Sequence, residues 1–274
     1  MSEAALAPPP ASGWLRRALA GIGRGARART RFVLLLSSLI WGVLREVGRP
    51  GNWRRTVRAE FRRALRQSVG GGLAVTLVTA VLIGLAMVSQ TLYWLSQAGE
   101  AGLIGSVIVI VVVRELTPIL VGFILLGRSG MVALSELALL RAGGQVDALA
   151  AQGLDPFQLL VLPRAVALAV AAFTLAVLFV AAALVTGFVA GSLLGAVTAS
   201  LWSFLDGVLR AMGAVDYVVF PAKMLTIGLL VALTAALTGL EAGPRDDSAQ
   251  VLPRGFIRGT LAILFASIAL SFAV

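Results

Sequence analysis

Long apolar runs constrain the fold of this chain more than any other feature of its sequence. A helix needs about 20 apolar residues to cross the hydrocarbon core of a bilayer. Hydrophobic residues make up 59% of the 274 positions and charged residues 13%, which is typical of a protein that crosses a membrane several times. We therefore predict an all-α polytopic membrane protein with about five transmembrane helices, at residues 68–95, 116–140, 164–195, 217–240 and 256–274.

Positive charge is concentrated at the N-terminal end. Of the 23 Lys and Arg residues, 14 precede residue 67. Cytoplasmic loops are enriched in these residues, so we expect a cytoplasmic N terminus. A basic region, residues 1–66, would precede a transmembrane domain, residues 67–274, and residues 16–44 would form a helix in the cytoplasmic interface. Because an apolar body follows the arginines, a membrane surface explains this charge better than nucleic acid does.

Two adjacent opposite charges, Arg114 and Glu115, interrupt an apolar stretch. Ionisable groups at membrane depth are costly and are usually functional. Pro118 lacks a backbone N–H and disfavours helical backbone at Thr117. Irregular backbone is tolerated in a membrane where protein or a water-filled cavity covers it. We therefore predict a broken or re-entrant segment at residues 114–118 beside a cavity. The alternative is a surface loop between two short helices.

A polar interval, residues 141–163, separates the second and third spans. Residues 145–152 can form a short amphipathic helix, which Gly153 and the following Asp-Pro turn would end. Arg141 and Arg164 flank the interval and place it in the cytoplasm. A short helix in this position is suited to docking a soluble partner.

Three glycines in the third span, Gly187, Gly191 and Gly195, are four residues apart. This spacing places them on one helix face and allows a neighbouring helix to approach closely. The neighbour is either another helix of the same chain or a second copy of the chain.

The residue types present exclude several kinds of chemistry. The chain has no Cys and no His, so it lacks disulfides, thiol chemistry and the most common metal ligand and general base. The phosphate-binding pattern Gly-x-x-x-x-Gly-Lys-Ser/Thr is absent, because the sole lysine, Lys223, follows Pro-Ala. No cluster has metal-ligand spacing, and no nucleophile has a candidate base nearby in sequence. We expect a transporter or channel subunit that is not an enzyme and binds no metal or cofactor itself.

Several short segments, in their order and spacing, resemble the MlaE/YrbE permease family. They are Arg114-Glu115-Leu116-Thr117-Pro118, Gly127-Arg128-Ser129-Gly130, Ser135-Glu136-Leu137, Gln145-Val146-Asp147-Ala148-Leu149, Gly153-Leu154-Asp155-Pro156 and Leu162-Pro163-Arg164. The resemblance implies the membrane subunit of an ABC-type lipid transporter in a bacterial inner membrane. A separate ATPase subunit would bind ATP, a second permease copy or a paralogue would pair with this chain, and an MCE-domain protein would lie on the periplasmic side. The cargo would be a phospholipid or a related lipid.

The resemblance also implies roles for individual residues. Arg114, Glu115 and Lys223 would lie at the lipid pocket, where a headgroup phosphate meets cationic side chains. The part that faces the ATPase would contain Glu136, Arg141, Gln145, Asp147, Leu149 and Arg164. Arg128 and Glu136 are eight residues apart, on roughly one helix face. A structural ion pair between them is the alternative to a functional role.

The sequence departs from the family pattern at Gly143-Gly144, where Thr-Glu or Ser-Glu is usual. Two glycines weaken a helix start and remove a carboxylate. Two other functions stay open. A carrier driven by an ion gradient would use Glu115 as its coupling site and need no ATPase, and a membrane scaffold would bind anionic lipid through its basic N-terminal region without transport.

Overall fold

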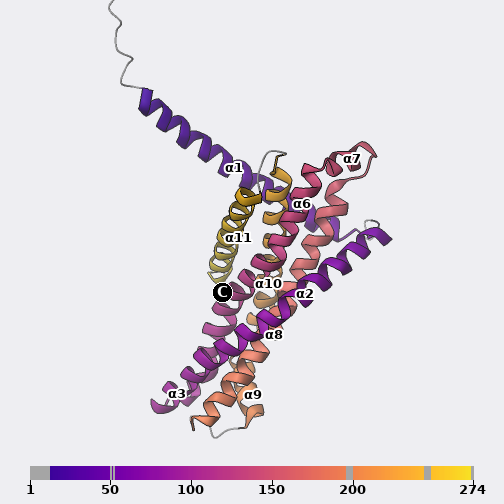
Figure 1. Ribbon diagram of the computed structural model, residues 1–274. Coiled ribbons are helices and arrows are strands. Elements are labelled where there is room, and N and C mark those ends of the chain that lie inside the picture. Colours follow the sequence, from indigo (N-terminus) through magenta and orange to yellow (C-terminus); the bar gives the residue numbers. More distant parts are fainter. Residues whose placement is uncertain (1–12, 50, 52, 196–199, 244–247, 273–274) are drawn as a thin grey trace, which may run out of the picture.

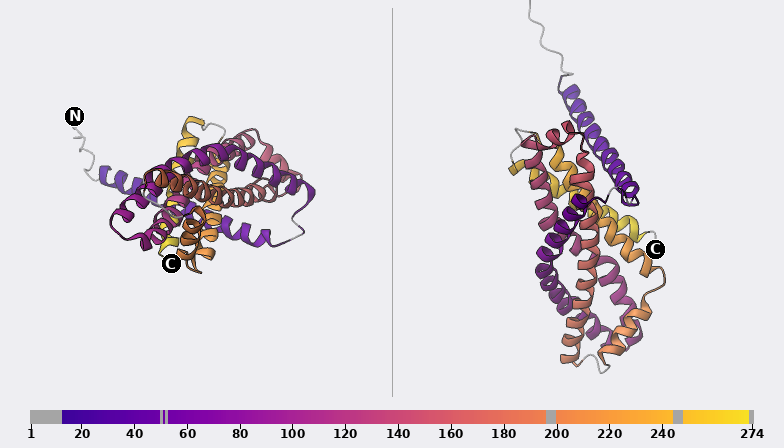
Figure 2. Two further views of the ribbon diagram at one scale, coloured as in Figure 1. Left: turned by 90° about the horizontal axis from the view of Figure 1, so that it is seen from below. Right: turned by 90° about the vertical axis from the view of Figure 1, so that its right-hand side faces the viewer.

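Long helices packed side by side make up the computed structural model, which describes residues 13–49, 51, 53–195, 200–243 and 248–272 (Figures 1 and 2). All regular structure within these residues is helical. Five helical stretches are long and apolar enough to cross a membrane, namely Arg55–Gln97, Ile104–Ala142, Phe157–Leu193, Asp216–Glu241 and Ala249–Ser271. The prediction of an all-α protein with five spans is confirmed, and the chain is a multi-pass membrane protein.

The first three spans contain π-helical turns, which lie between α-helical parts in the first two spans and at the start of the third. The first span consists of α2 (Arg55–Ile83), the π-turn η2 (Gly84–Val88) and α3 (Ser89–Gln97). The second follows a short 3₁₀ turn, η3 (Ala101–Leu103), and consists of α4 (Ile104–Ile108), η4 (Val109–Leu116), α5 (Thr117–Leu125), η5 (Leu126–Gly130) and α6 (Met131–Ala142). The third consists of η6 (Phe157–Val161) and α8 (Leu162–Leu193). Turns of this type widen a helix and often occur at functional sites.

The last two spans, α10 (Asp216–Glu241) and α11 (Ser248–Ser271), are single α-helices. They are shorter than the first three, with 26 and 24 residues against 43 for the first. The described end of α11 therefore lies between the two ends of the bundle, while α3 and α9 (Leu201–Ala211) form the end opposite α7 (Gln145–Ala151) (Figure 1).

The main core lies where α10 packs against α8, α5 and α6, and where α2 packs against α8. Its fully buried side chains include Leu175 and Phe179 of α8 and Met224, Ile227 and Val231 of α10. A second core, at the end of the bundle opposite α7, joins the end of α8 to η2, α3, α4, η4 and α9. Burial of these two apolar cores positions the polar residues described below.

Close approach of α8 to the first span depends on glycine. A β-carbon added at Gly187 would lie 2.3 Å from the β-carbon of Val88, and one added at Gly191 would lie 2.6 Å from Leu92 Cδ1. The prediction of a close contact is confirmed for these two glycines, and the neighbour belongs to the same chain. Gly195 instead follows the end of α8, with a φ of 69°.

The predicted break at residues 114–118 is wrong, because the helix continues from Ile104 to Ala142. Pro118 cannot donate to the carbonyl four residues earlier, which belongs to Arg114. The chain widens into the π-helical η4 instead of breaking, and the Nζ of Lys223 donates a 2.6 Å hydrogen bond to that carbonyl. The second span therefore begins at Ile104 rather than at residue 116.

The N-terminal helix α1 (Gly13–Val47) forms as predicted and packs against α8 and α10. Val43 is buried in this contact, whereas Leu34, Trp41 and Leu44 are exposed. The expected domain boundary at residue 66 falls inside α2, and residues 1–12 lie outside the described part of the chain. The short helix predicted at residues 145–152 is confirmed as α7.

Candidate functional site

A cavity of about 130 Å³ lies where η4 meets α10 and α11. Its polar side chains are Arg114, Glu115, Asp216, Lys223 and Ser271. Its apolar side chains are Ile110, Val113, Val219, Phe220 and Leu270. The structure thus brings together the three residues predicted for a lipid pocket, which are Arg114, Glu115 and Lys223.

Arg114 forms a two-point ion pair with Asp216, the first residue of α10. Arg114 Nε lies 2.7 Å from Asp216 Oδ1, and Nη2 donates a 2.8 Å hydrogen bond to Oδ2. The backbone N–H of Gly213 also donates to Oδ2, at 2.9 Å. Asp216 is 4% exposed, whereas the Arg114 side chain is 39% exposed. The carboxylate is therefore fully engaged, and the guanidinium keeps an accessible surface toward the cavity.

Lys223 connects three helices through its buried ammonium group. In addition to the Arg114 carbonyl, Nζ donates to Ser271 Oγ at 2.7 Å and lies 3.7 Å from Glu115 Oε1. Ser271 Oγ donates to the same Glu115 oxygen at 2.7 Å. Lys223 is 4% exposed and Glu115 is 46% exposed. Lys223 therefore positions η4 against α10 and α11, while Glu115 and Arg114 present the accessible charges.

This arrangement has two cations and two anions, so its net charge is zero. An accessible guanidinium and an accessible carboxylate lie side by side on η4, next to apolar walls. Such a surface can hold a group that carries both polar and apolar parts, with charge-assisted hydrogen bonds to the polar part.

Asp216 and Ser271 were not among the predicted site residues. Asp216 precedes Lys223 by seven residues, or two helical turns, which places both on one face of α10. An arginine within a membrane span, such as Arg114, requires a carboxylate partner, and this spacing could have identified Asp216 as that partner. Ser271 carries no comparable signal, because a serine near the end of an apolar helix is common.

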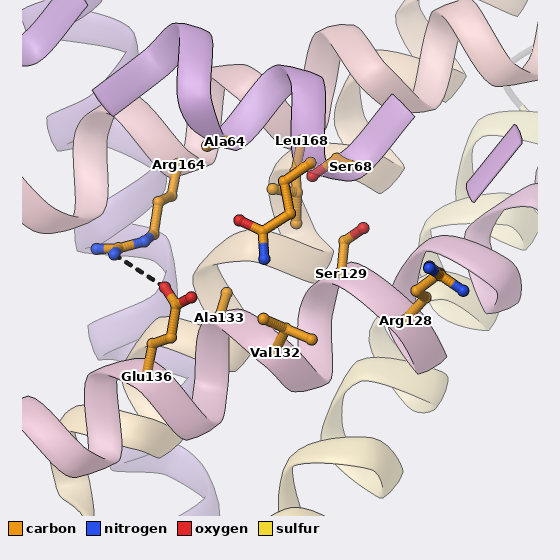
Figure 3. Close-up of a pocket in the computed structure, with 10 residues that line it drawn as sticks. Ala64, Ser68, Arg128, Ser129, Val132, Ala133, Glu136, Arg164 and Leu168 are labelled. Atoms are coloured by element: carbon orange, nitrogen blue, oxygen red, sulfur yellow. Dashed lines mark hydrogen bonds and ion pairs between the residues drawn. The ribbon is translucent and has the colours of Figure 1, made fainter. Parts of the chain in front are cut away.

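A second charged cluster lies toward the α7 end and is centred on Arg164 of α8. Arg164 Nη2 lies 3.0 Å from Glu60 Oε1 and 3.1 Å from Glu136 Oε2, and Nη1 donates to the Leu160 carbonyl at 3.0 Å. Arg164 is 9% exposed. The cluster ties α2 and α6 to α8, and Figure 3 shows its pair between Arg164 and Glu136. Glu60 was missed as a partner because it is distant in sequence.

The predicted ion pair between Arg128 and Glu136 does not form. Glu136 is paired with Arg164, and Arg128 lies away from it at the other side of the cluster (Figure 3). Arg128 belongs to the π-turn η5. Eight residues of helix separate the two backbone positions by about 12 Å along the axis, and Arg164 of α8 is the residue that pairs with Glu136.

The residues predicted to face an ATPase are divided between two places. Arg141 contacts Asp147 across the turn between α6 and α7, and Gln145 and Asp147 are exposed. No residue of α7 is buried, so the whole helix projects from the end of the bundle (Figure 1). Gly144, with a φ of 72°, forms the turn. Glu136 and Arg164, in contrast, belong to the network inside the bundle.

The described residues, 13–49, 51, 53–195, 200–243 and 248–272, contain no cluster of metal-ligating side chains. No group of three or more His, Cys, Asp or Glu side chains there could hold a metal ion.

Comparison with known proteins relates the chain to transporter permeases. The family model described as Permease MlaE matches residues 61–273. A probable ABC transporter permease protein of Synechocystis sp. is 27% identical over 200 residues, which cover 73% of this chain and 75% of that protein. A similar permease of Porphyra purpurea is 27% identical over 62% of this chain and 64% of its own length. The chloroplastic protein TRIGALACTOSYLDIACYLGLYCEROL 1 of Arabidopsis thaliana is 30% identical over 46% of this chain and 34% of its own length.

Proposed function

The chain belongs to the MlaE family of ABC transporter permeases, and from this premise we propose that it moves a phospholipid or a related lipid between its membrane and a partner protein on the periplasmic side. ATP hydrolysis by a separate subunit would drive the movement. The membrane would be a bacterial inner membrane with the N terminus in the cytoplasm. An MCE-domain protein on the periplasmic side would exchange lipid with the permease.

The cavity at Arg114 is the observation that carries this proposal. A lipid headgroup is polar and its acyl chains are apolar, and the cavity combines an accessible guanidinium with five apolar side chains. A headgroup phosphate would contact Arg114, and an amine or hydroxyl of the headgroup would contact Glu115. Lys223 would act as a positioning residue. The name of the Arabidopsis relative, which contains that of a glycerolipid, is consistent with a lipid cargo.

The exposed helix α7 supports docking of an ATPase at that end of the bundle. A helix of seven residues with no buried side chain contributes little to the core of the permease. Asp147 and Leu149 would contact the ATPase directly, and the turn at Gly143 and Gly144 would set the angle of α7. A second copy or a paralogue would complete the membrane part, and α1, within the basic region 1–66, would lie in the cytoplasmic interface beside the domain 67–274.

Affinity purification of the tagged chain from its own membrane, in a mild detergent, tests this proposal. Mass spectrometry of the purified material is expected to find an ABC ATPase, an MCE-domain protein and bound phospholipid. Arg114→Gln is expected to reduce the bound lipid without loss of the ATPase. A chain that purifies alone, under conditions that keep other membrane complexes intact, would overturn the proposal.

A carrier driven by an ion gradient is the second candidate. It is favoured by the exposed carboxylate of Glu115, which could take up and release a proton. This function predicts transport that depends on a gradient and is abolished by Glu115→Gln. It gives no role to the projecting α7, and for that reason we favour the ATP-driven function.

A further inference from the structure

A second cavity, of about 190 Å³, lies between α2, α8 and the η5–α6 part of the second span (Figure 3). It lies nearer the α7 end of the bundle and shares no lining residue with the cavity at Arg114. Its polar lining consists of Gln67, Ser68, Arg128, Ser129, Glu136 and Arg164. Transport as proposed above uses only the first cavity, so the purpose of this polar lining is unexplained.

Charge is distributed unevenly along this second cavity. At one end, Glu60 and Glu136 share the guanidinium of Arg164, Glu60 also lies 4.0 Å from Arg63 Nη1, and the side chain of Glu136 is 34% exposed. At the other end, Arg128 is exposed and forms no ion pair with any residue that the structure describes. Figure 3 shows Ser129, Val132 and Ala133 between the two ends. The cavity therefore has an accessible carboxylate, that of Glu136, at one end and the guanidinium of Arg128 at the other.

Gly71 of α2 allows the guanidinium of Arg128 to lie against the helix backbone. A β-carbon added at Gly71 would lie 2.7 Å from Arg128 Nε, whereas one added at the preceding Gly70 would meet no atom within 4 Å. Gly71 is therefore needed for the observed position of Arg128, and Gly70 is not. The observed position of this cation therefore depends on the absence of a side chain at Gly71.

The depth of Arg128 identifies the anion that it can meet. Gly71 follows the polar residue Gln67 by four residues, which is about 6 Å along a helix. The arginine-rich first half of α2 ends at Arg66, just before this point. An unpaired cation at the boundary between polar and apolar surroundings lies within reach of lipid phosphates, which are the abundant anions at that depth.

We propose that this cavity binds the headgroup of a phosphate-bearing zwitterionic lipid from the leaflet at the α7 end. The phosphate contacts Arg128, and Gln67, Ser68 and Ser129 supply neutral hydrogen bonds. The ammonium group points toward Glu136, whose side chain is 34% exposed. This site is separate from the one at Arg114, and the inference requires only that the chain lies in a membrane. It does not depend on the direction of transport or on an ATPase.

Native mass spectrometry of the full chain in detergent, titrated with phosphatidylethanolamine, tests the proposal through two matched substitutions. Gly71→Ala displaces the flexible end of Arg128, whereas Gly70→Ala makes the same chemical change without touching it. We expect Gly70→Ala to bind like the wild type, and Gly71→Ala and Arg128→Gln to weaken one binding event by about tenfold, as for loss of a charge-assisted hydrogen bond. Arg114→Gln is expected to weaken a different lipid-binding event. The double variant Arg114→Gln/Arg128→Gln is therefore expected to be weakened in both events.

Two further measurements show whether the ligand is a zwitterionic lipid, an anionic lipid or a free headgroup compound. Phosphatidylglycerol, which lacks the ammonium group, is expected to bind more weakly than phosphatidylethanolamine. Free phosphoethanolamine at equal concentration is expected not to compete, because the acyl chains hold the lipid at this depth. Equal lipid binding by Gly70→Ala, Gly71→Ala and Arg128→Gln would overturn the proposal. So would a change of oligomeric state in Arg128→Gln with unchanged lipid binding, because Arg128 would then contact a second copy of the chain.

Discussion

The hydrogen bond from Lys223 to the Arg114 carbonyl is expected to compensate for Pro118. Pro118 has no N–H to offer this carbonyl, and Lys223 Nζ donates to it at 2.6 Å. Lys223→Met keeps most of the volume of the side chain and removes the donor. A part-buried carbonyl without a partner costs about 1–3 kcal/mol. Loss of the contact with Glu115, which is 46% exposed, adds about 0–1 kcal/mol.

A double-mutant cycle isolates the hydrogen bond. Pro118→Ala restores a backbone N–H that can donate to the Arg114 carbonyl, so Lys223→Met should then cost less. We expect Lys223→Met to lower the free energy of unfolding by about 2–3 kcal/mol in the wild type and by about 1 kcal/mol in Pro118→Ala. Unfolding in mixed micelles of detergent and SDS, followed by circular dichroism, measures all four variants. If the free-energy costs of Lys223→Met and Pro118→Ala sum to that of the double variant within about 0.5 kcal/mol, the compensation is refuted.

Three further variants test other contacts. Asp216→Asn leaves a partly exposed guanidinium without its carboxylate and should lower the free energy of unfolding by about 2 kcal/mol in the same assay. Gly187→Ala should cost about 1–3 kcal/mol, because the new β-carbon would lie 2.3 Å from that of Val88. Asp147→Arg combined with Leu149→Arg should reduce the ATP hydrolysis of the purified complex about tenfold while the permease stays folded.

The first two of these variants have a comparison substitution that makes their results interpretable. Asp206→Asn removes an ion pair with Arg210 whose side chains are 56% and 80% exposed, and it should change stability by less than about 1 kcal/mol. Gly70→Ala, in open space, should not destabilise the chain. Equal effects of Asp216→Asn and Asp206→Asn, or of Gly187→Ala and Gly70→Ala, would contradict the reasoning. Unchanged ATP hydrolysis in the α7 variant would show that the ATPase docks elsewhere.

Hydropathy and spacing predicted the parts of the fold that depend on local sequence. The five spans, the N-terminal helix and α7 follow from apolar length, basic charge and helix-stop residues. The contact at Gly187 and Gly191 follows from their four-residue spacing. These features repeat along one helix, so they are visible without knowledge of which helices are neighbours.

The errors at Pro118 and Arg128 arose from partners that are distant in sequence and, at Pro118, from a π-turn. Pro118 was expected to break the helix, but the carbonyl that it leaves free is bonded by Lys223, 109 residues from Arg114. Arg128 was expected to pair with Glu136, but Arg164, 28 residues from Glu136, binds Glu136 instead. Neither a widened turn nor a long-range partner has a periodic signal in a single sequence.

ATP-dependent lipid transfer by the purified complex in proteoliposomes tests the central claim most directly. The wild-type complex is expected to transfer a labelled phospholipid only when ATP is hydrolysed. The Arg114→Gln complex is expected to keep its ATPase subunit and lose most of the transfer. Transfer that continues without ATP and follows an imposed proton gradient would contradict the assignment as an ATP-driven lipid permease.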